Sequence, residues 1–458
     1  MRSPRALAAV LTSAAALVAA LSVPLVAPPG AGADTGTAPA VTFADADGIH
    51  VLDATQVDAR EWALDLSTPA LGDHSVRLRV LLPSDYTDTS TRYPVLYLFH
   101  GTSGGPDDWI DAGDAEQTTA GLPLIVVLPD AGFDNDGGGW FTNWWDKSTA
   151  LGPSNWETFH IDQLIPFVDA NLRTDATRAG RAIAGLSQGG FGAFSYAARH
   201  PDLFAVAGSF SGAPDITSDP VIEAGATGVI EGTAAALDQV EPAAMFGPHL
   251  TNELNWQGHD PTRLITNLRG MSLDLYTATG LPGELDTTLD LSAMGIEFLT
   301  HISTLAFTAH AKAAGLPYYL DDYVFGTHTF PYWARDLRDF VPRMMDVFAH
   351  PAAGPSTISY RSVDATWTQW GWTVANHRAA SLAWSSLSNA SASGFTLSGA
   401  GSADVTTPAD YAPGSVHQVG VGSASQQALT ADASGALHVS VTLHGALTPT
   451  GTVTVSIN

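Results

Sequence analysis

A pentapeptide with the pattern G-x-S-x-G, Gly185 to Gly189, is the feature of this sequence that points most directly to chemistry. It follows a strand-like run, Arg181–Ala184, and precedes a Gly- and Ala-rich stretch expected to be helical. A nucleophile on a sharp strand-to-helix turn has a strained backbone, so its neighbours two residues away must be small. The helix N-terminus also offers N–H groups to a developing oxyanion. The pattern therefore predicts Ser187 as a nucleophile rather than a plain turn serine.

A serine hydroxyl needs a general base, because it is barely ionised at neutral pH. His328 follows the strand expected over residues 318–325, in the segment Gly326-Thr327-His328. Where a G-x-S-x-G turn carries the nucleophile, the chain order is serine, acid, histidine, and the base lies on the loop after the last strand. This layout predicts His328 as the base.

The acid that orients the base has three candidates. Glu284 and Asp286 lie in the loop after the strand expected over 271–277, and Glu297 lies further on, at the start of a predicted helix. An orienting carboxylate must reach the imidazole nitrogen that faces away from the serine. The layout of the sequence alone leaves this choice open.

Two main-chain N–H groups are expected to form the oxyanion hole. One belongs to Gln188, directly after the nucleophile, and the other to the loop after the strand expected over 94–99. That loop begins with His100 and Gly101 and is rich in flexible residues, and we predict Thr102 as the second donor. Aromatic residues near a nucleophile often shape an acyl pocket, so Trp144 and Trp145 are candidates for a substrate pocket, with core packing as the equal alternative.

The elements around these residues predict an α/β-hydrolase fold with a mostly parallel sheet. Apolar strand-like runs alternate with helical stretches up to about residue 350, and residues 34–55 are expected to be a small, polar leader into the fold. Residues 351–356 contain two prolines and a glycine and are expected to form a linker. Beyond them, short alternating runs separated by turn residues predict a small β-sandwich over 357–458, so that the catalytic domain would cover 34–350.

Four tryptophans of this C-terminal region leave a further question open. They either form a stacking platform for a polymer or the cell envelope, or pack the core of the sandwich. The four are Trp367, Trp370, Trp372 and Trp384.

Composition limits the possible settings of this chemistry. The chain has 458 residues, a formal net charge of −27 and no cysteine, which excludes disulfides and thiolate metal sites and disfavours nucleic acid as a partner. Residues 1–33 have two early arginines, an apolar run and small residues at the end, which predicts a signal peptide cleaved after Ala33 and a secreted protein. We predict no metal and no cofactor, because no zinc-type or phosphate-binding motif is present.

Residues 93–346 resemble the esterase D and mycolyltransferase family of α/β-hydrolases, which includes the mycobacterial fibronectin-binding antigens. The matching blocks occur in the family's order along most of this region. They include Trp156-Glu157-Thr158-Phe159, Gly185-Leu186-Ser187, His200-Pro201, Gly208-Ser209-Phe210-Ser211, Met245-Phe246-Gly247-Pro248, Asp260-Pro261-Thr262 and Gly326-Thr327-His328.

The resemblance implies Ser187 as nucleophile, His328 as base and Glu297 as acid, with Asp286 in reserve. At the sugar side of the pocket the chain departs from the mycolyltransferases. His100 stands where they have an aspartate, Ser103 where they have an arginine, and Phe330 where they have a tryptophan.

These residues predict an enzyme that hydrolyses a carboxylic ester through an acyl-enzyme. The substrate would be a small-molecule, lipid or polymer ester. The alternative is an acyltransferase of the mycolyl or diacylglycerol type that uses the same triad. A third hypothesis is a non-catalytic protein that binds the cell wall or a matrix on this scaffold.

Overall fold

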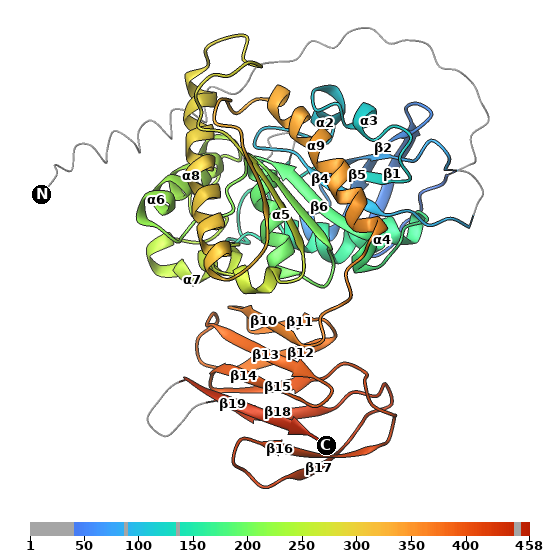
Figure 1. The fold of residues 1–458 in the computed structure, drawn as a ribbon, viewed down its shortest axis with the longest axis vertical. Coiled ribbons are helices and arrows are strands. Elements are labelled where there is room, and N and C mark those ends of the chain that lie inside the picture. Colours follow the sequence, from blue (N-terminus) through green and yellow to red (C-terminus); the bar gives the residue numbers. More distant parts are fainter. Residues whose placement is uncertain (1–40, 87–89, 134–137, 444–449) are drawn as a thin grey trace, which may run out of the picture.

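The computed structural model describes residues 41–86, 90–133, 138–443 and 450–458. Its larger part is built around a nine-stranded sheet with helices on both faces, and two smaller sheets lie below it in Figure 1. The predicted signal peptide and its cleavage site after Ala33 lie outside the described residues. None of the described helices is long and apolar enough to cross a membrane.

The large sheet is antiparallel at one edge and parallel elsewhere. Its strands are β1 (His50–Gln56), β2 (Glu61–Ser67), β3 (Val76–Leu81), β4 (Val95–Phe99), β5 (Ile125–Pro129), β6 (Arg181–Leu186), β7 (Val206–Phe210), β8 (Ser272–Thr277) and β9 (Tyr319–Asp322). They lie in the order β1-β2-β3-β5-β4-β6-β7-β8-β9. The pairs β1–β2, β2–β3 and β3–β5 are antiparallel. The pairs β5–β4, β4–β6, β6–β7, β7–β8 and β8–β9 are parallel. The α/β-hydrolase fold predicted from the sequence is confirmed.

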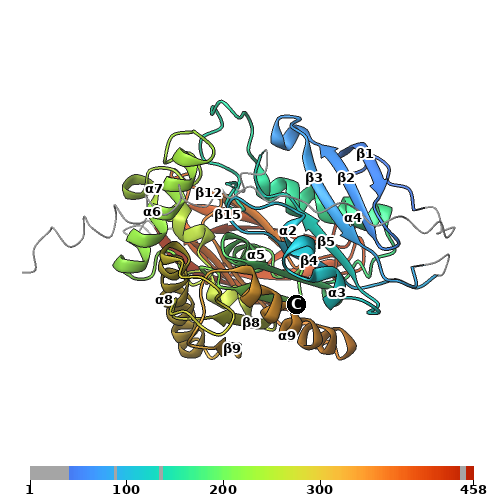
Figure 2. The ribbon, with the colours of Figure 1, turned by 90° about the horizontal axis from the view of Figure 1, so that it is seen from above.

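Helices cover both faces of this sheet. They are α2 (Asp108–Asp111), α3 (Ala115–Thr118), α4 (Ile165–Asn171), α5 (Gln188–Arg199), α6 (Pro220–Ala236), α7 (His249–His259), α8 (Leu291–Ala313) and α9 (Phe330–Ala349). Short helical turns are η1 (Pro69–Leu71), η2 (Thr158–Leu164), η3 (Arg178–Gly180) and η4 (Ile265–Leu268). Figure 2 shows α6, α7 and α8 gathered at one end of the sheet, with β1 to β3 at the other.

Two apolar cores lie on the two faces because side chains alternate along each strand. In β4, Tyr97 and Phe99 pack with residues of α5, whereas Leu96 and Leu98 pack with residues of α9. All residues of β4, β5 and β6 are buried, as expected for strands that are covered on both faces.

The C-terminal region forms two antiparallel sheets around a separate core, which confirms the predicted sandwich-like fold. The six-stranded sheet contains β10 (Ile358–Ser362), β13 (Ser385–Ser391), β14 (Gly394–Ala400), β19 (Thr450–Ile457), β16 (Val416–Val421) and β17 (Gln427–Thr430). The four-stranded sheet contains β11 (Thr366–Gln369), β12 (Trp372–His377), β15 (Ser402–Thr406) and β18 (His438–Thr442).

The tryptophans of this region do not form an exposed platform. Trp367 and Trp372 are buried in the sandwich core, and the partly buried Trp370 packs against it. Trp384 packs against the core of the large sheet. Of the two alternatives left open by the sequence, packing is the one observed.

One sequence interpretation is wrong. Residues 34–55 were expected to be a leader, yet His50–Gln56 form the edge strand β1, paired antiparallel with β2. Edge strands are often polar because only one side of the strand pairs with a neighbour, which explains why alternation was weak here. The domain boundaries at 351–356 remain a prediction.

Candidate active site

Ser187 lies on a sharp turn between β6 and α5. Its backbone angles are φ 53° and ψ −123°, a conformation that non-glycine residues rarely adopt. A Cβ atom added to Gly185 would lie 2.5 Å from the main chain of Gly189, and one added to Gly189 would lie 2.4 Å from the oxygen of His100. The glycines are therefore required by the close packing of this turn against β4.

His328 lies on the loop between β9 and α9 and carries one free ring nitrogen. Its Nδ1 atom is 2.8 Å from Glu297 Oε2. Since a carboxylate only accepts hydrogen bonds, Nδ1 carries the hydrogen and Nε2 is left as an acceptor. This Nε2 atom is buried and has no hydrogen-bond partner among the described residues. His328 and Ser187 line the same cavity.

Glu297, in the second turn of α8, is fully buried and held by three donors. Its Oε1 atom accepts from Ser211 Oγ at 2.9 Å and from the Ala278 N–H at 2.8 Å, while Oε2 faces His328. Burying a carboxylate is costly unless it is hydrogen-bonded, and here both oxygens have partners. The arrangement fixes the orientation of the imidazole ring.

Asp286 does not reach the imidazole. Its carboxylate accepts hydrogen bonds from Thr327 Oγ1, from the Gly283 N–H at 2.7 Å and from Tyr332 Oη at 2.8 Å. It therefore tethers the loop that carries His328 rather than the ring itself. The third candidate, Glu284, is exposed.

Thr102 and Gln188, the two predicted oxyanion donors, lie together at the cavity. Both line it, and Gln188 Nε2 donates to Thr102 Oγ1 at 3.2 Å. This side-chain contact links the loop after β4 to the first turn of α5. The main-chain groups at both positions therefore belong to one pre-organised unit, as an oxyanion hole requires.

His100 is not part of the cavity wall, contrary to our expectation. It is buried, its Nε2 accepts from the Ala131 N–H at 2.9 Å, and its Nδ1 donates to the Gly101 oxygen at 2.8 Å. Because Nε2 accepts a hydrogen bond the ring is neutral, and burial lowers the pKa of His100 in the same sense. Both nitrogens are used to hold the oxyanion loop, which leaves none for a substrate.

Of the four other residues predicted for the substrate pocket, the two tryptophans lie outside the cavity lining. Trp144 is fully buried, and its Nε1 donates to the Gly139 oxygen at 3.1 Å. Trp145 is 47% exposed, away from the cavity lining. The aromatic segment thus packs the core or faces solvent. Ser103 and Phe330 line the cavity, and their role in a substrate pocket stays a prediction.

The cavity beside Ser187 has a volume of about 600 Å³ and a largely apolar inner wall. Helices α6 and α8, which lie side by side in Figure 1, supply most of that wall. Their apolar lining residues include Ile222, Gly225, Ala226, Val229, Ile296, Leu299 and Ile302, and Trp140 and Trp333 also line the cavity. Sequence reasoning missed these residues because apolar positions on a helix look the same whether they face a core or a cavity.

The ionisable residues of the lining are His328 and four aspartates. The aspartates are Asp108, Asp111, Asp215 and Asp290, and no Lys or Arg is among the described residues that line the cavity. Burial raises the pKa of Asp108 to about 6. The cavity therefore disfavours anionic ligands.

Comparison with known proteins agrees with this geometry. The model of the esterase family matches residues 69–344, more than half of the chain. This chain belongs to the esterase family. Within the described residues, no group of three or more His, Cys, Asp or Glu side chains is placed to hold a metal ion.

Two relatives show which members of the family the chain is similar to. Esterase Rv1288 of Mycobacterium tuberculosis is 44% identical over 178 residues, which are 38% of this chain and 37% of that protein. The diacylglycerol acyltransferase/mycolyltransferase Ag85B of Mycobacterium leprae is 31% identical over 274 residues, which are 57% of this chain and 78% of that protein. The chain thus spans little more than a third of the length of the first of these relatives.

Among solved structures, MPT51 of Mycobacterium tuberculosis is similar with 25% sequence identity and a TM-score of 0.48. The match covers 62% of this chain and 95% of that protein.

Proposed function

We propose that this protein is a serine carboxylic-ester hydrolase with Ser187, His328 and Glu297 as its catalytic triad. The observation that carries the proposal is the His328 ring, which is bound through Nδ1 to a buried carboxylate and has a free Nε2 in the cavity of Ser187. Membership of the esterase family supports the same reaction class.

The reaction proceeds through an acyl-enzyme. His328 Nε2 takes the proton of Ser187 Oγ while this oxygen attacks the carbonyl carbon of the ester. The N–H groups of Thr102 and Gln188 stabilise the tetrahedral oxyanion, and Glu297 stabilises the imidazolium. The C–O bond to the alcohol then breaks, and His328 returns the proton to the leaving oxygen. A water molecule, deprotonated by His328, releases the acid in the same way.

The cavity supports an uncharged ester with an aliphatic acyl group as the substrate. Its inner wall, between α6 and α8, is apolar, and burial of acyl methylenes there contributes roughly 0.8 kcal/mol per CH₂. Carboxylates on the lining oppose binding of anionic esters, and the described lining residues include no Lys or Arg to pair with a substrate charge.

The test is turnover of a series of nitrophenyl esters of increasing acyl length by the wild type and by Ser187→Ala. We expect Ser187→Ala to lose turnover of all of them while its circular dichroism spectrum and Tm stay unchanged. A variant that kept wild-type turnover would refute the proposal.

Acyl transfer is the second candidate, and similarity to Ag85B favours it. Hydrolysis and transfer share the acyl-enzyme and differ in which hydroxyl attacks it. His100, Ser103 and Phe330 differ from the residues that the mycolyltransferases have at the sugar side of the pocket. These differences favour hydrolysis. Mass spectrometry of acylated trehalose or diglyceride products, formed with each acceptor present, would reveal transfer.

We also propose that the protein is secreted, which rests on the composition of residues 1–33. N-terminal sequencing of the protein from culture medium tests this proposal. A mature chain beginning at Asp34 is expected.

A further inference from the structure

The C-terminal sandwich contacts the larger part of the molecule at the end of α5 opposite Ser187 (Figure 1). Helix α5 has 12 residues and is therefore about 18 Å long. At its last residue the main-chain oxygen of Arg199 accepts hydrogen bonds from Tyr360 Oη at 2.8 Å and from Gln369 Nε2 at 2.8 Å. The last carbonyls of a helix have no partner within it, so these two side chains cap α5.

A third cap is shared by both parts of the molecule. Asn267, in η4, donates from Nδ2 to the Ala198 oxygen at 2.9 Å and to the Arg361 oxygen at 3.0 Å. Its Oδ1 accepts from the Arg361 N–H at 2.9 Å. The buried amide thus joins the last turn of α5 to strand β10 of the sandwich.

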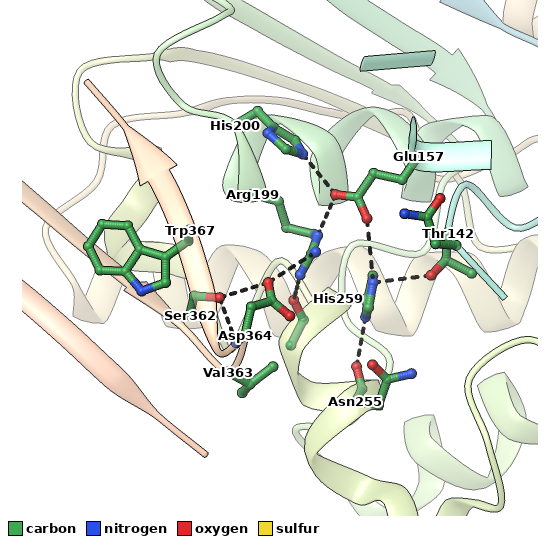
Figure 3. A network of polar contacts seen from close by, with 12 residues as sticks. Thr142, Glu157, Arg199, His200, Asn255, His259, Ser362, Val363, Asp364 and Trp367 are labelled. Carbon is green, nitrogen blue, oxygen red and sulfur yellow. Dashed lines mark hydrogen bonds and ion pairs between the residues drawn. The ribbon is translucent and has the colours of Figure 1, made fainter. Parts of the chain in front are cut away.

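The Arg199 side chain crosses the same interface (Figure 3). It donates to Glu157 Oε1 at 2.7 Å on the catalytic side and to Asp364 Oδ2 at 3.2 Å on the sandwich side. A further hydrogen bond reaches the Gly258 oxygen at 2.9 Å. His200 Nε2 lies 2.8 Å from the same oxygen of Glu157.

Electrostatics keeps this pair ionised although it is buried. Burial alone would raise the pKa of Glu157, but Arg199, the hydrogen bond from His200 and the nearby His259 ring lower it well below its ordinary value. Burial opposes the charge of Arg199, and Glu157 and Asp364 nevertheless raise its pKa. Removing one partner of such a buried pair leaves an uncompensated charge.

The two surfaces also fit sterically. Val363 is fully buried against helix α7, and a Cβ atom added to Gly258 would lie 2.3 Å from Val363 Cγ2. At the turn between β11 and β12, Trp370 has a positive φ of 54°, and its N–H donates to Asp202 Oδ2 at 2.7 Å. The guanidinium carbon of Arg178 lies 5.3 Å from the centre of the Trp370 ring.

We infer that the C-terminal sandwich is a permanent cap of helix α5 and not a separately moving module. Hydrogen bonds, a buried ion pair and close packing meet at one helix end, and each of them needs the sandwich in a fixed position. The role of Ser187 at the start of α5 rests on the proposed function, but the interface itself does not. All described residues that line the active-site cavity lie between Gly101 and Trp333, so none of them belongs to the sandwich. The cap therefore acts at the end of α5 that is far from the cavity.

The first test cuts the connection between the two parts. A protease recognition sequence is inserted after Ala353, in the exposed segment 351–356, and the folded full-length protein is cleaved. We expect the two fragments to elute together from gel filtration in native buffer and to separate only in denaturant. Separation in native buffer would overturn the inference.

The second test removes the caps one at a time in the full chain. Hydrogen exchange of peptides covering residues 194–200 is measured for Tyr360→Phe, for Gln369→Ala and for a control, Tyr411→Phe. The control removes a hydroxyl that donates to the Ala392 oxygen at 2.7 Å inside the sandwich.

We expect several-fold faster exchange in Tyr360→Phe and Gln369→Ala and no change in the control. Wild-type exchange in both variants would contradict the inference. Neither test measures ester turnover, so either result leaves the proposal for Ser187 to be judged on its own experiment.

Discussion

At the scale of single residues, the arrangement around His328 separates two carboxylates that are close in sequence. Glu297 accepts directly from the ring, whereas Asp286 holds Thr327 and Tyr332 and touches only the surroundings of the ring. A residue that orients the base affects the imidazolium in the transition state. A residue that tethers the loop affects only how firmly the base is placed.

Replacing these carboxylates by amides therefore has unequal effects. We expect Glu297→Gln to lower kcat by about 10³–10⁴-fold, because the base loses its tautomer and its counter-charge. Asp286→Asn loses hydrogen bonds of about 1 kcal/mol each and is expected to lower kcat less than about tenfold. Steady-state kinetics on one nitrophenyl ester measures both. An equal or larger loss in Asp286→Asn would assign the acid differently.

At the scale of elements, helices α6 and α8 form the part of the cavity wall that the proposed function assigns to the acyl chain. Gly225 of α6 faces Leu299 of α8, and a Cβ atom added to Gly225 would lie 3.4 Å from Leu299 Cδ2, an ordinary contact. A modest side chain is therefore tolerated there. It would fill part of the space between the helices.

Gly225→Val is expected to shorten the preferred acyl chain. We predict that kcat/KM for a decanoyl ester falls by about 10-fold or more while that for an acetyl ester stays within about twofold, because lost methylene burial is worth about 1–3 kcal/mol. The control is Ala224→Val, next to it on α6 but outside the cavity lining. Parallel losses for both ester lengths would argue that the helix was distorted instead.

At the scale of the whole molecule, buried carboxylates with raised pKa values keep protons that exposed carboxylates of this acidic chain release. Burial raises the pKa of Asp336 to about 7, and burial together with Asp215 raises the pKa of Asp260. Between neutral pH and about pH 4.5 the folded protein therefore binds protons that the unfolded chain does not bind, so stability rises as the pH falls. Glu157, whose pKa is lowered, acts in the opposite direction only below about pH 4.5.

The Tm is consequently expected to increase from pH 8 to about pH 5.5 and to decrease below about pH 4.5. Protonation also reduces the electrostatic repulsion within a chain of net charge −27, and this effect likewise raises the Tm as the pH falls. Calorimetric scans across this range measure the effect. Asp336→Asn should flatten the rise, whereas Asp404→Asn, at an exposed site, should not. A Tm that falls steadily from pH 8 to pH 5.5 would contradict the assignment.

The sequence by itself determined the nucleophile turn and the layout of the base. Small residues at fixed spacing between a strand and a helix encode the turn at Ser187 locally, and His328 follows from its place after a strand. The α/β-hydrolase fold and the β-sandwich could also be predicted, because the length and period of an apolar run indicate how each element is buried.

Only the tertiary structure decided which distant groups meet. Only the packing of the chain brings Glu297, and not Asp286, to the imidazole ring. Only the packing also brings the N–H of Ala131 to His100 Nε2, while the other ring nitrogen binds the neighbouring Gly101 oxygen. The acyl cavity and the cap on α5 likewise need segments that are separated in sequence. Spacing fixes neighbours along a strand or helix, but contacts between elements depend on how those elements pack.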